Sequence, residues 1–130
     1  MNSLGFVEVS GVVAAVDALD IMCKSADVQL VSWERKLGGR LVTLIVTGNV
    51  SAVTAAVESA KESCIKKPAA TAIIANPHAE TVKLVELSAS RLRKQAEKEK
   101  TAAKKNATET AANETAKPAR KSPSSTTKKG

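Results

Sequence analysis

The sequence predicts an α/β fold of the ferredoxin-like type, in which a β-α-β-β-α-β sandwich is followed by a short C-terminal helix and a disordered tail. Two apolar strand patterns flank a glycine-containing turn within residues 27–53. Segments with helical periodicity precede and follow this strand pair. A hydrophobic content of 43% in 130 residues is enough for one core.

The strand pair comprises Val28–Glu34 and Leu41–Thr47, which are rich in valine, leucine and isoleucine. In the turn between them, Gly38 and Gly39 allow positive φ angles and a close approach of backbone at the tip. We therefore expect two antiparallel strands joined by a small turn at residues 35–40.

A short strand at Leu4–Val9 places Leu4 and Phe6 on one face, and a first helix follows at Val12–Ser25. Apolar residues recur in this helix at helical spacing, which predicts one buried stripe. The predicted stripe consists of Val12, Val16, Leu19 and Cys23.

A second helix is predicted at Val50–Ser63, with Asn49 as its N-cap. Its expected stripe consists of Val50, Val53, Val57, Ala60 and Cys64. The continuous small apolar run Ala70–Ala75 predicts a fourth strand in a buried, central position. A short third helix follows at Ala79–Leu87, and its expected inward residues are Val82, Leu84 and Val85.

The charge distribution divides the chain into two parts. Residues 1–88 contain 8 Lys and Arg against 9 Asp and Glu, whereas residues 89–130 contain 12 against 4, a net charge of +8. We expect a domain at residues 1–88 and a basic, low-complexity extension at residues 89–130. The extension has good helix formers up to about residue 105, and its later composition predicts disorder.

No catalytic or metal-binding pattern is visible. Cys23 and Cys64 are far apart in sequence and do not form a metal pair or a CxxC motif, which favours buried, reduced thiols. His78 is the single histidine, and a polar surface position just after a strand is its simplest interpretation. We expect no catalytic residues, no metal and no cofactor.

Membrane insertion and sequence-specific RNA binding are also disfavoured. The chain has no apolar run long enough to span a bilayer and its N-terminus lacks the pattern of a signal peptide, so we expect a soluble, cytoplasmic protein. RNA-binding sheets of this topology stack bases on aromatic side chains, and Trp33 stands alone here. Nucleic acid is expected to bind only non-specifically, through the lysines of the extension.

The residues resemble the single-domain bacterial microcompartment shell proteins, the BMC-domain family. The matching stretches are residues 4–9, 11–15, 20–26, 28–53 and 74–78. Each motif is weak alone, but their ordered combination covers nearly all of residues 4–87. The resemblance implies a hexameric tile that packs with other tiles into a shell around metabolic enzymes, with a central pore for small metabolites. It implies a location in a microcompartment and leaves the extension unexplained.

By resemblance, the glycine turn lines the pore on the sixfold axis. The implied pore residues are Lys36, Leu37, Gly38, Gly39 and Arg40. The common family pattern is Lys-Ile-Gly-Ser-Gly, so Arg40 replaces a glycine, and the preceding strand is one residue longer than in many relatives. Six guanidinium groups near one axis would favour anions. The alternative is that Arg40 points along a subunit interface and pairs with a carboxylate.

By resemblance, a second set of residues forms the edge between hexamers: Lys24, Asp27, Asn76, Pro77 and His78. Many relatives have arginine at the position of Asn76, so the edge contact differs here. The alternative for Lys24 is an ordinary exposed lysine at a helix end.

The resemblance thus implies a structural shell protein that forms homohexamers and contacts other shell proteins and encapsulated enzymes. One alternative is an oligomeric binding module whose basic tail recruits an acidic partner or nucleic acid. Another is a small enzyme or a ligand-binding regulatory protein on the same fold, against which the lack of a titratable cluster counts.

Overall fold

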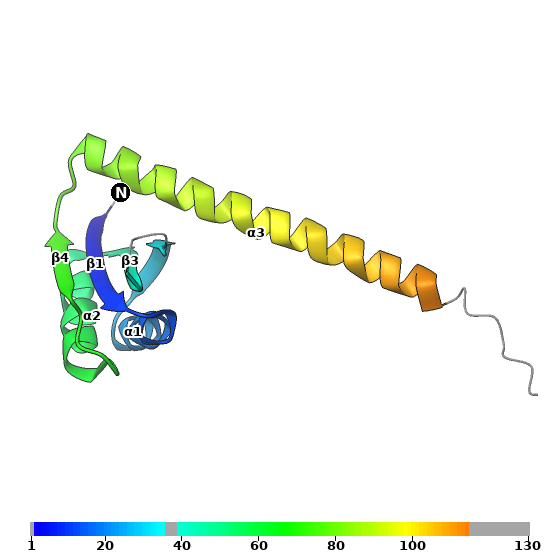
Figure 1. The fold of residues 1–130 in the computed structure, drawn as a ribbon. Coiled ribbons are helices and arrows are strands. Elements are labelled where there is room, and N and C mark those ends of the chain that lie inside the picture. The colour runs from blue at the N-terminus through cyan, green and yellow to red at the C-terminus, as the bar shows by residue number, and fades with distance from the viewer. Residues whose placement is uncertain (1, 36–38, 115–130) are drawn as a thin grey trace, which may run out of the picture. The chain divides into compact units, whose positions relative to one another are not determined.

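The computed structural model describes residues 2–35 and 39–114 of the 130-residue chain, with side chains described up to residue 109. The elements follow the predicted order along the chain (Figure 1). They are β1 (Ser3–Ser10), α1 (Val12–Ser25), β2 (Val28–Glu34), β3 (Leu41–Gly48), α2 (Val50–Ser63), β4 (Ala70–Ile74) and α3 (Ala79–Glu114).

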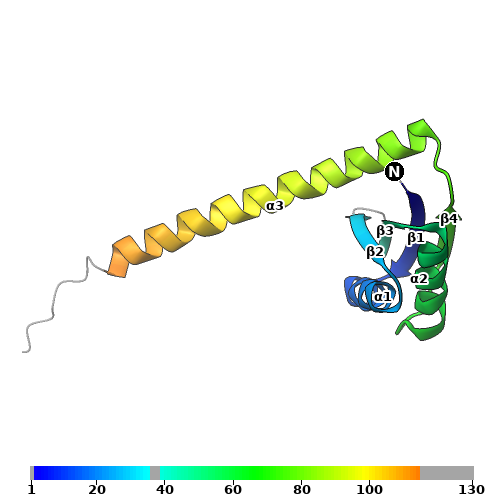
Figure 2. The ribbon, with the colours of Figure 1, turned by 180° about the vertical axis from the view of Figure 1, so that it is seen from behind.

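The four strands form one sheet in the order β2-β3-β1-β4, and every neighbouring pair is antiparallel. This is the strand order of the ferredoxin-like fold, so the predicted fold class is confirmed. Figures 1 and 2 show β1 next to β4 in one view and β2 next to β3 in the view from behind. Because β1 and β3 are central, they carry most of the buried strand residues.

The predicted central position of the fourth strand is wrong. β4 pairs only with β1 and forms an edge of the sheet. Residues Ala70 and Ala72 are exposed, and Ile73 is 39% exposed. The small apolar run resembles a buried strand in composition, but composition does not say which strand has neighbours on both sides.

One face of the sheet packs against α1 and α2 and holds the main core. On α1, the buried residues are Ala14, Ala15, Ala18 and Met22. The predicted stripe is therefore wrong: Val12 and Val16 are about half exposed and Cys23 is exposed. Alanines let α1 approach the sheet and α2 closely, so the helix buries its small face and turns its valines outward.

On the second helix, Val53, Val57 and Ala60 are buried as predicted, and so is Ala56, which was not part of the predicted stripe. Val50, which was expected in the buried stripe, is 47% exposed, and Cys64 is half-buried. Asn49 is the N-cap residue, as predicted, but its side chain makes no capping hydrogen bond. Its carbonyl instead accepts a hydrogen bond from Val53 N–H at 2.9 Å.

The opposite face of the sheet packs against the beginning of α3. Its smaller cluster consists of buried Leu4, Ile45 and Val85, with Phe6 among the partly buried residues around it. Val85 was predicted to point inward, whereas Leu84 is 69% exposed and its inward prediction is wrong.

Helix α3 is longer than predicted, because it continues to Glu114. The chain divides into two compact units, residues 1–95 and residues 96–130, and the described part of the second unit is helical. The expected disorder after about residue 105 is therefore wrong for residues 106–114. For residues 115–130 the expectation lies outside the described residues.

Candidate functional site

The two predicted sites lie at opposite ends of the sheet. Ser10 pairs with Leu41 at the end where residues 35–40 connect β2 to β3, and we call this the turn end. At the other end, the far end, Val28 pairs with Gly48 and Gly48 with Ser3. Helix α1 starts directly after β1 at the turn end and finishes directly before β2 at the far end, so it spans both.

Part of the predicted pore turn is described. Lys36, Leu37 and Gly38 lie outside the described residues, whereas Arg35, Gly39 and Arg40 are exposed. Gly39 has a φ of 77°, as expected for a glycine in a tight turn.

Arg40 has a φ of 60°, and no other non-glycine residue of the described chain has a positive φ. Its carbonyl accepts a hydrogen bond from Gly11 N–H at 2.7 Å, which ties the turn to the start of α1. This conformation costs an ordinary L-residue about 1–2 kcal/mol. Arg40 thus occupies a position whose backbone favours glycine.

Two further charged residues flank the start of the turn, and sequence reasoning did not identify their roles. The guanidinium of Arg35 lies 4.6 Å from the ring centroid of Trp33, in a cation–π contact. Glu34, the last residue of β2, accepts a hydrogen bond from Ser88 on α3. The spacing of two residues between Trp33 and Arg35 could have indicated the cation–π contact. The contact between Glu34 and Ser88 joins distant parts of the chain, so no local sequence pattern indicated it.

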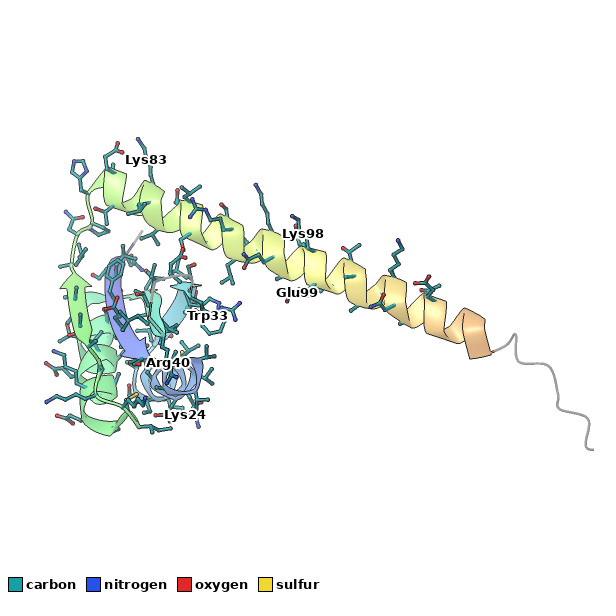
Figure 3. The ribbon with its side chains drawn as sticks, in the orientation of Figure 1. Lys24, Trp33, Arg40, Lys83, Lys98 and Glu99 are labelled. Carbon is teal, nitrogen blue, oxygen red and sulfur yellow. The ribbon has the colours of Figure 1, made fainter. Side chains whose placement is uncertain are left out.

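At the far end, Lys24 lies in the last turn of α1 and is labelled in Figure 3. Its Nζ is 2.7 Å from Oδ2 of Asp20, one helical turn earlier. The hydrogen bond with Asp20 and the negative charge of that carboxylate raise the pKa of Lys24. Both side chains are largely exposed, so the pair leaves Lys24 open to further contacts.

The other predicted edge residues fall at the same end but on both sides of the sheet. Asp27 precedes β2, which is one edge strand, whereas Asn76 and Pro77 follow β4, which is the other edge strand. Asp27 and Asn76 are exposed and Pro77 is half-buried. Within one chain, the fold therefore places these residues at one end without bringing Asp27 into contact with Asn76.

His78 has a local structural role that the sequence did not predict. Its Nδ1 accepts a hydrogen bond from Glu80 N–H at 3.1 Å, and its carbonyl accepts one from Val82 N–H at 3.0 Å. These contacts satisfy N–H groups in the first turn of α3, so His78 acts as the N-cap.

An exposed apolar patch lies on α1 near the turn end. Val12, Val13 and Val16 are 46%, 75% and 54% exposed, and Ile65 is 70% exposed. Ile65 N–H donates a hydrogen bond to Oδ2 of Asp17 at 3.0 Å, which fixes Ile65 beside α1. We call these four apolar residues the α1 patch.

The part of the chain that the structure describes contains no cluster of metal ligands and no membrane-spanning helix. Residues 2–35 and 39–114 contain no group of three or more potential metal ligands. Within the same residues, no helix is long and apolar enough to cross a membrane.

A polar pocket of about 310 Å³ at the far end is lined by Asn2, Asp27, Gln29, Thr47, Gly48 and Asn49.

The model of the BMC domain matches residues 3–77, which is more than half of the chain. This chain belongs to the BMC-domain family. It is 41% identical over 86 residues to the bacterial microcompartment shell protein PduA of Citrobacter freundii, covering 65% of this chain and 91% of that protein. It is also 41% identical over 91 residues to the carboxysome shell protein CsoS1C of Hydrogenovibrio crunogenus, covering 68% and 88%.

A solved microcompartment protein from Desulfitobacterium hafniense DCB has the same fold, with a TM-score of 0.59 and 25% sequence identity. The match covers 68% of this chain and 48% of that one, so this chain spans about half the length of that protein. The family match and the curated relatives agree on the role: this BMC-domain chain is a structural shell protein of a bacterial microcompartment.

Proposed function

We propose that this shell protein works as a homohexameric tile that meets other shell proteins edge to edge and encloses metabolic enzymes. The turn at residues 35–40 surrounds a central pore for small metabolites, and the far end of the sheet forms the edge between hexamers. The protein itself has no catalytic activity and needs no cofactor. This assembly assigns one role to each end of the sheet.

The α1 patch is the observation that carries the proposal. Large apolar side chains that are about half exposed or more, gathered next to one another, are typical of a surface that another protein covers. The patch lies near the turn end, because it includes the first residues of α1, and Gly11, directly before α1, donates a hydrogen bond to the Arg40 carbonyl. Closed rotational symmetry that buries the patch between subunits also brings copies of the turn around one axis.

Native mass spectrometry of the full chain tests this assembly. We expect a species of six times 13.5 kDa, and we expect Val16→Asp to reduce it to smaller species because a charge would be buried in the interface. Leu84→Asp is the matched control, since Leu84 is 69% exposed on α3, away from the α1 patch. A wild-type monomer, or a Val16→Asp hexamer, would contradict the proposal.

In the proposed pore, Arg40 gives a preference for anions. The residue is exposed and makes no ion pair among the described residues. Six such charges around a narrow opening produce a positive potential that attracts anions and repels cations. Shells built with Arg40→Gly are expected to admit an anionic tracer more slowly, and an unchanged rate would rule out this role of the arginine.

At the proposed edge, Lys24 contacts its neighbour in the next hexamer, together with Asp27, Asn76, Pro77 and His78. Lys24 is exposed at the end of α1 and Asp27 follows three residues later. We expect Lys24→Ala to leave the hexamer intact in native mass spectrometry while reducing the hexagonal sheets seen by negative-stain microscopy. Sheets as extensive as those of the wild type would argue against an edge role.

A further inference from the structure

A chain of hydroxyl groups connects α3 to the end of β2. Ser88 on α3 is 8% exposed and Ser32 on β2 is fully buried, and their hydroxyl oxygens are 2.6 Å apart. The hydroxyl of Ser88 donates to Oε1 of Glu34. Because a serine hydroxyl has one proton, Ser32 must be the donor to Ser88. Both hydroxyls are therefore oriented toward the carboxylate.

An irregularity in β2 makes these contacts possible. The register with β3 shifts between Leu30 and Ser32, so Val31 is an extra residue in a β-bulge. Val28, before the bulge, packs in the core on the α1 and α2 face. With strict alternation Ser32 and Glu34 would share that face. The bulge turns both residues to the α3 face instead.

Trp33, between Ser32 and Glu34 on β2, and Arg35, directly after the strand, lie on the other face. Trp33 packs against the core on the α1 and α2 face, and Arg35 lies over its ring. Trp33 is the last residue but one of β2 and is labelled in Figure 3. The strand therefore separates the carboxylate of Glu34 from the guanidinium of Arg35, although the two residues are consecutive.

We propose that Ser88 is a positioning residue for the electrostatics of the turn. The bulge places Glu34 on the α3 face, and the hydrogen bond from Ser88 holds its carboxylate there, so that this negative charge does not pair with the adjacent Arg35. The inference rests on the proposed pore, whose positive charge it would preserve. Because Ser88 belongs to α3, the position of the Glu34 carboxylate beside Arg35 depends on a contact with this helix.

The direction of the effect follows from the charges. A carboxylate that loses a hydrogen-bond donor in a half-buried position gains by moving to another partner. Arg35 is the adjacent cation, and it is exposed, whereas Trp33 beneath it is half-buried. Pairing with Glu34 would draw Arg35 off the ring and cancel one positive charge in each copy of the turn.

Trp33 offers a readout that does not depend on a pore, because it is the only tryptophan of the chain. We expect Ser88→Ala to change the Trp33 emission of the full-length protein. Ser90→Ala is the matched control, since Ser90 is two residues further along α3 and donates to the Leu87 carbonyl instead. Ser88→Thr, which keeps the hydroxyl, should restore the wild-type spectrum.

Two variants keep this test decisive. Ser88→Cys fills similar space with a weak donor and should shift the emission in the same direction if Ser88→Ala does not fold. In a Glu34→Gln background the Ser88→Ala change should disappear, because no released carboxylate remains. A folded Ser88 variant with the Ser90→Ala spectrum, or a change that persists without the Glu34 carboxylate, would overturn the proposal.

The pore itself is tested in shells assembled from the full-length protein, with one anionic and one cationic tracer. We expect Ser88→Ala to slow the entry of the anionic tracer relative to the cationic one, and Ser90→Ala to leave this ratio at the wild-type value. If wild-type protein is not hexameric, or its shells exclude both tracers, the proposed function fails. If wild-type shells admit the tracers and Ser88→Ala leaves both the ratio and Trp33 emission unchanged, only the role of Ser88 fails.

Discussion

The interior of the domain and its two sheet-end sites are built on different physical principles. On the α1 and α2 face, every buried residue of the main core cluster is aliphatic, alanine or methionine, and apolar burial packs the two helices against the sheet. The described candidate residues at the turn end and the far end are mostly exposed and are held by few contacts, such as Arg40 to Gly11 and Lys24 to Asp20. Substitutions in the buried core should therefore lower the free energy of unfolding far more than substitutions at the two candidate sites.

The largest effect is expected in the interior. Leu44 is fully buried on the α1 and α2 face, and Leu44→Ala should lower the free energy of unfolding by about 3–5 kcal/mol. The same change at Leu4, fully buried in the smaller cluster under α3, should cost about 2–3 kcal/mol because the surroundings can collapse more easily. Urea unfolding at one protein concentration measures both. Equal losses would show that the two faces contribute alike.

Adding a methyl group to the same interior should lower the free energy of unfolding by less than the Leu44→Ala substitution does. A Cβ at Gly5 would lie 2.8 Å from Cγ1 of Val53 and 3.0 Å from Cγ2 of Val46, closer than atoms normally approach. Gly5→Ala is therefore expected to lower the free energy of unfolding by about 1–3 kcal/mol. Val53→Ala makes room for the new methyl, so the double variant should lose less than the sum of the two single losses. Additive losses would locate the strain elsewhere.

The order of elements was predictable from sequence because it depends on local periodicity. Both helices that cover the main core have the predicted bounds, and so does β2. The errors concern which face or neighbour each element has. The valines of α1 have the spacing of a buried stripe, but the helix buries its alanines because close packing against α2 depends on shape as well as apolar area.

The candidate sites were less predictable for the same reason. The glycine turn was visible as a pattern, and Gly39 has the positive φ that it implied. The contact of Ser88 with Glu34 joins residues 54 positions apart, and the α1 patch becomes visible only when the fold leaves it uncovered. Such surfaces depend on tertiary packing, which periodicity in a single sequence does not encode.

At the turn end, a substitution should stabilise the fold. Arg40 has a φ of 60°, which glycine adopts without steric cost. Arg40→Gly is expected to raise the free energy of unfolding by about 1 kcal/mol, the relief of strain exceeding the entropy that glycine adds to the unfolded chain. Arg40→Ala is the control, since alanine keeps the strain and removes only the charge. If Arg40→Ala stabilises the protein as much, charge repulsion rather than backbone strain is the cause.

At the far end, the smallest effect is expected, and it depends on pH. Asp20 raises the folded-state pKa of Lys24 above its usual 10.5, so the charged lysine is favoured in the folded protein. The stabilisation is therefore fully present below pH 10.5 and is lost as the pH rises through the folded-state pKa. Asp20→Asn should be slightly less stable than the wild type at neutral pH, and this difference should vanish at higher pH.

Urea unfolding at neutral pH and above the folded-state pKa, together with an NMR titration of the Lys24 side chain, measures this linkage. Glu62→Gln removes an exposed carboxylate that makes no ion pair in the described chain, and it should show no difference in this pH window. Added salt should weaken the Asp20 effect, because both partners are exposed to solvent. An effect that persists above the folded-state pKa would mean that Asp20 stabilises α1 without Lys24.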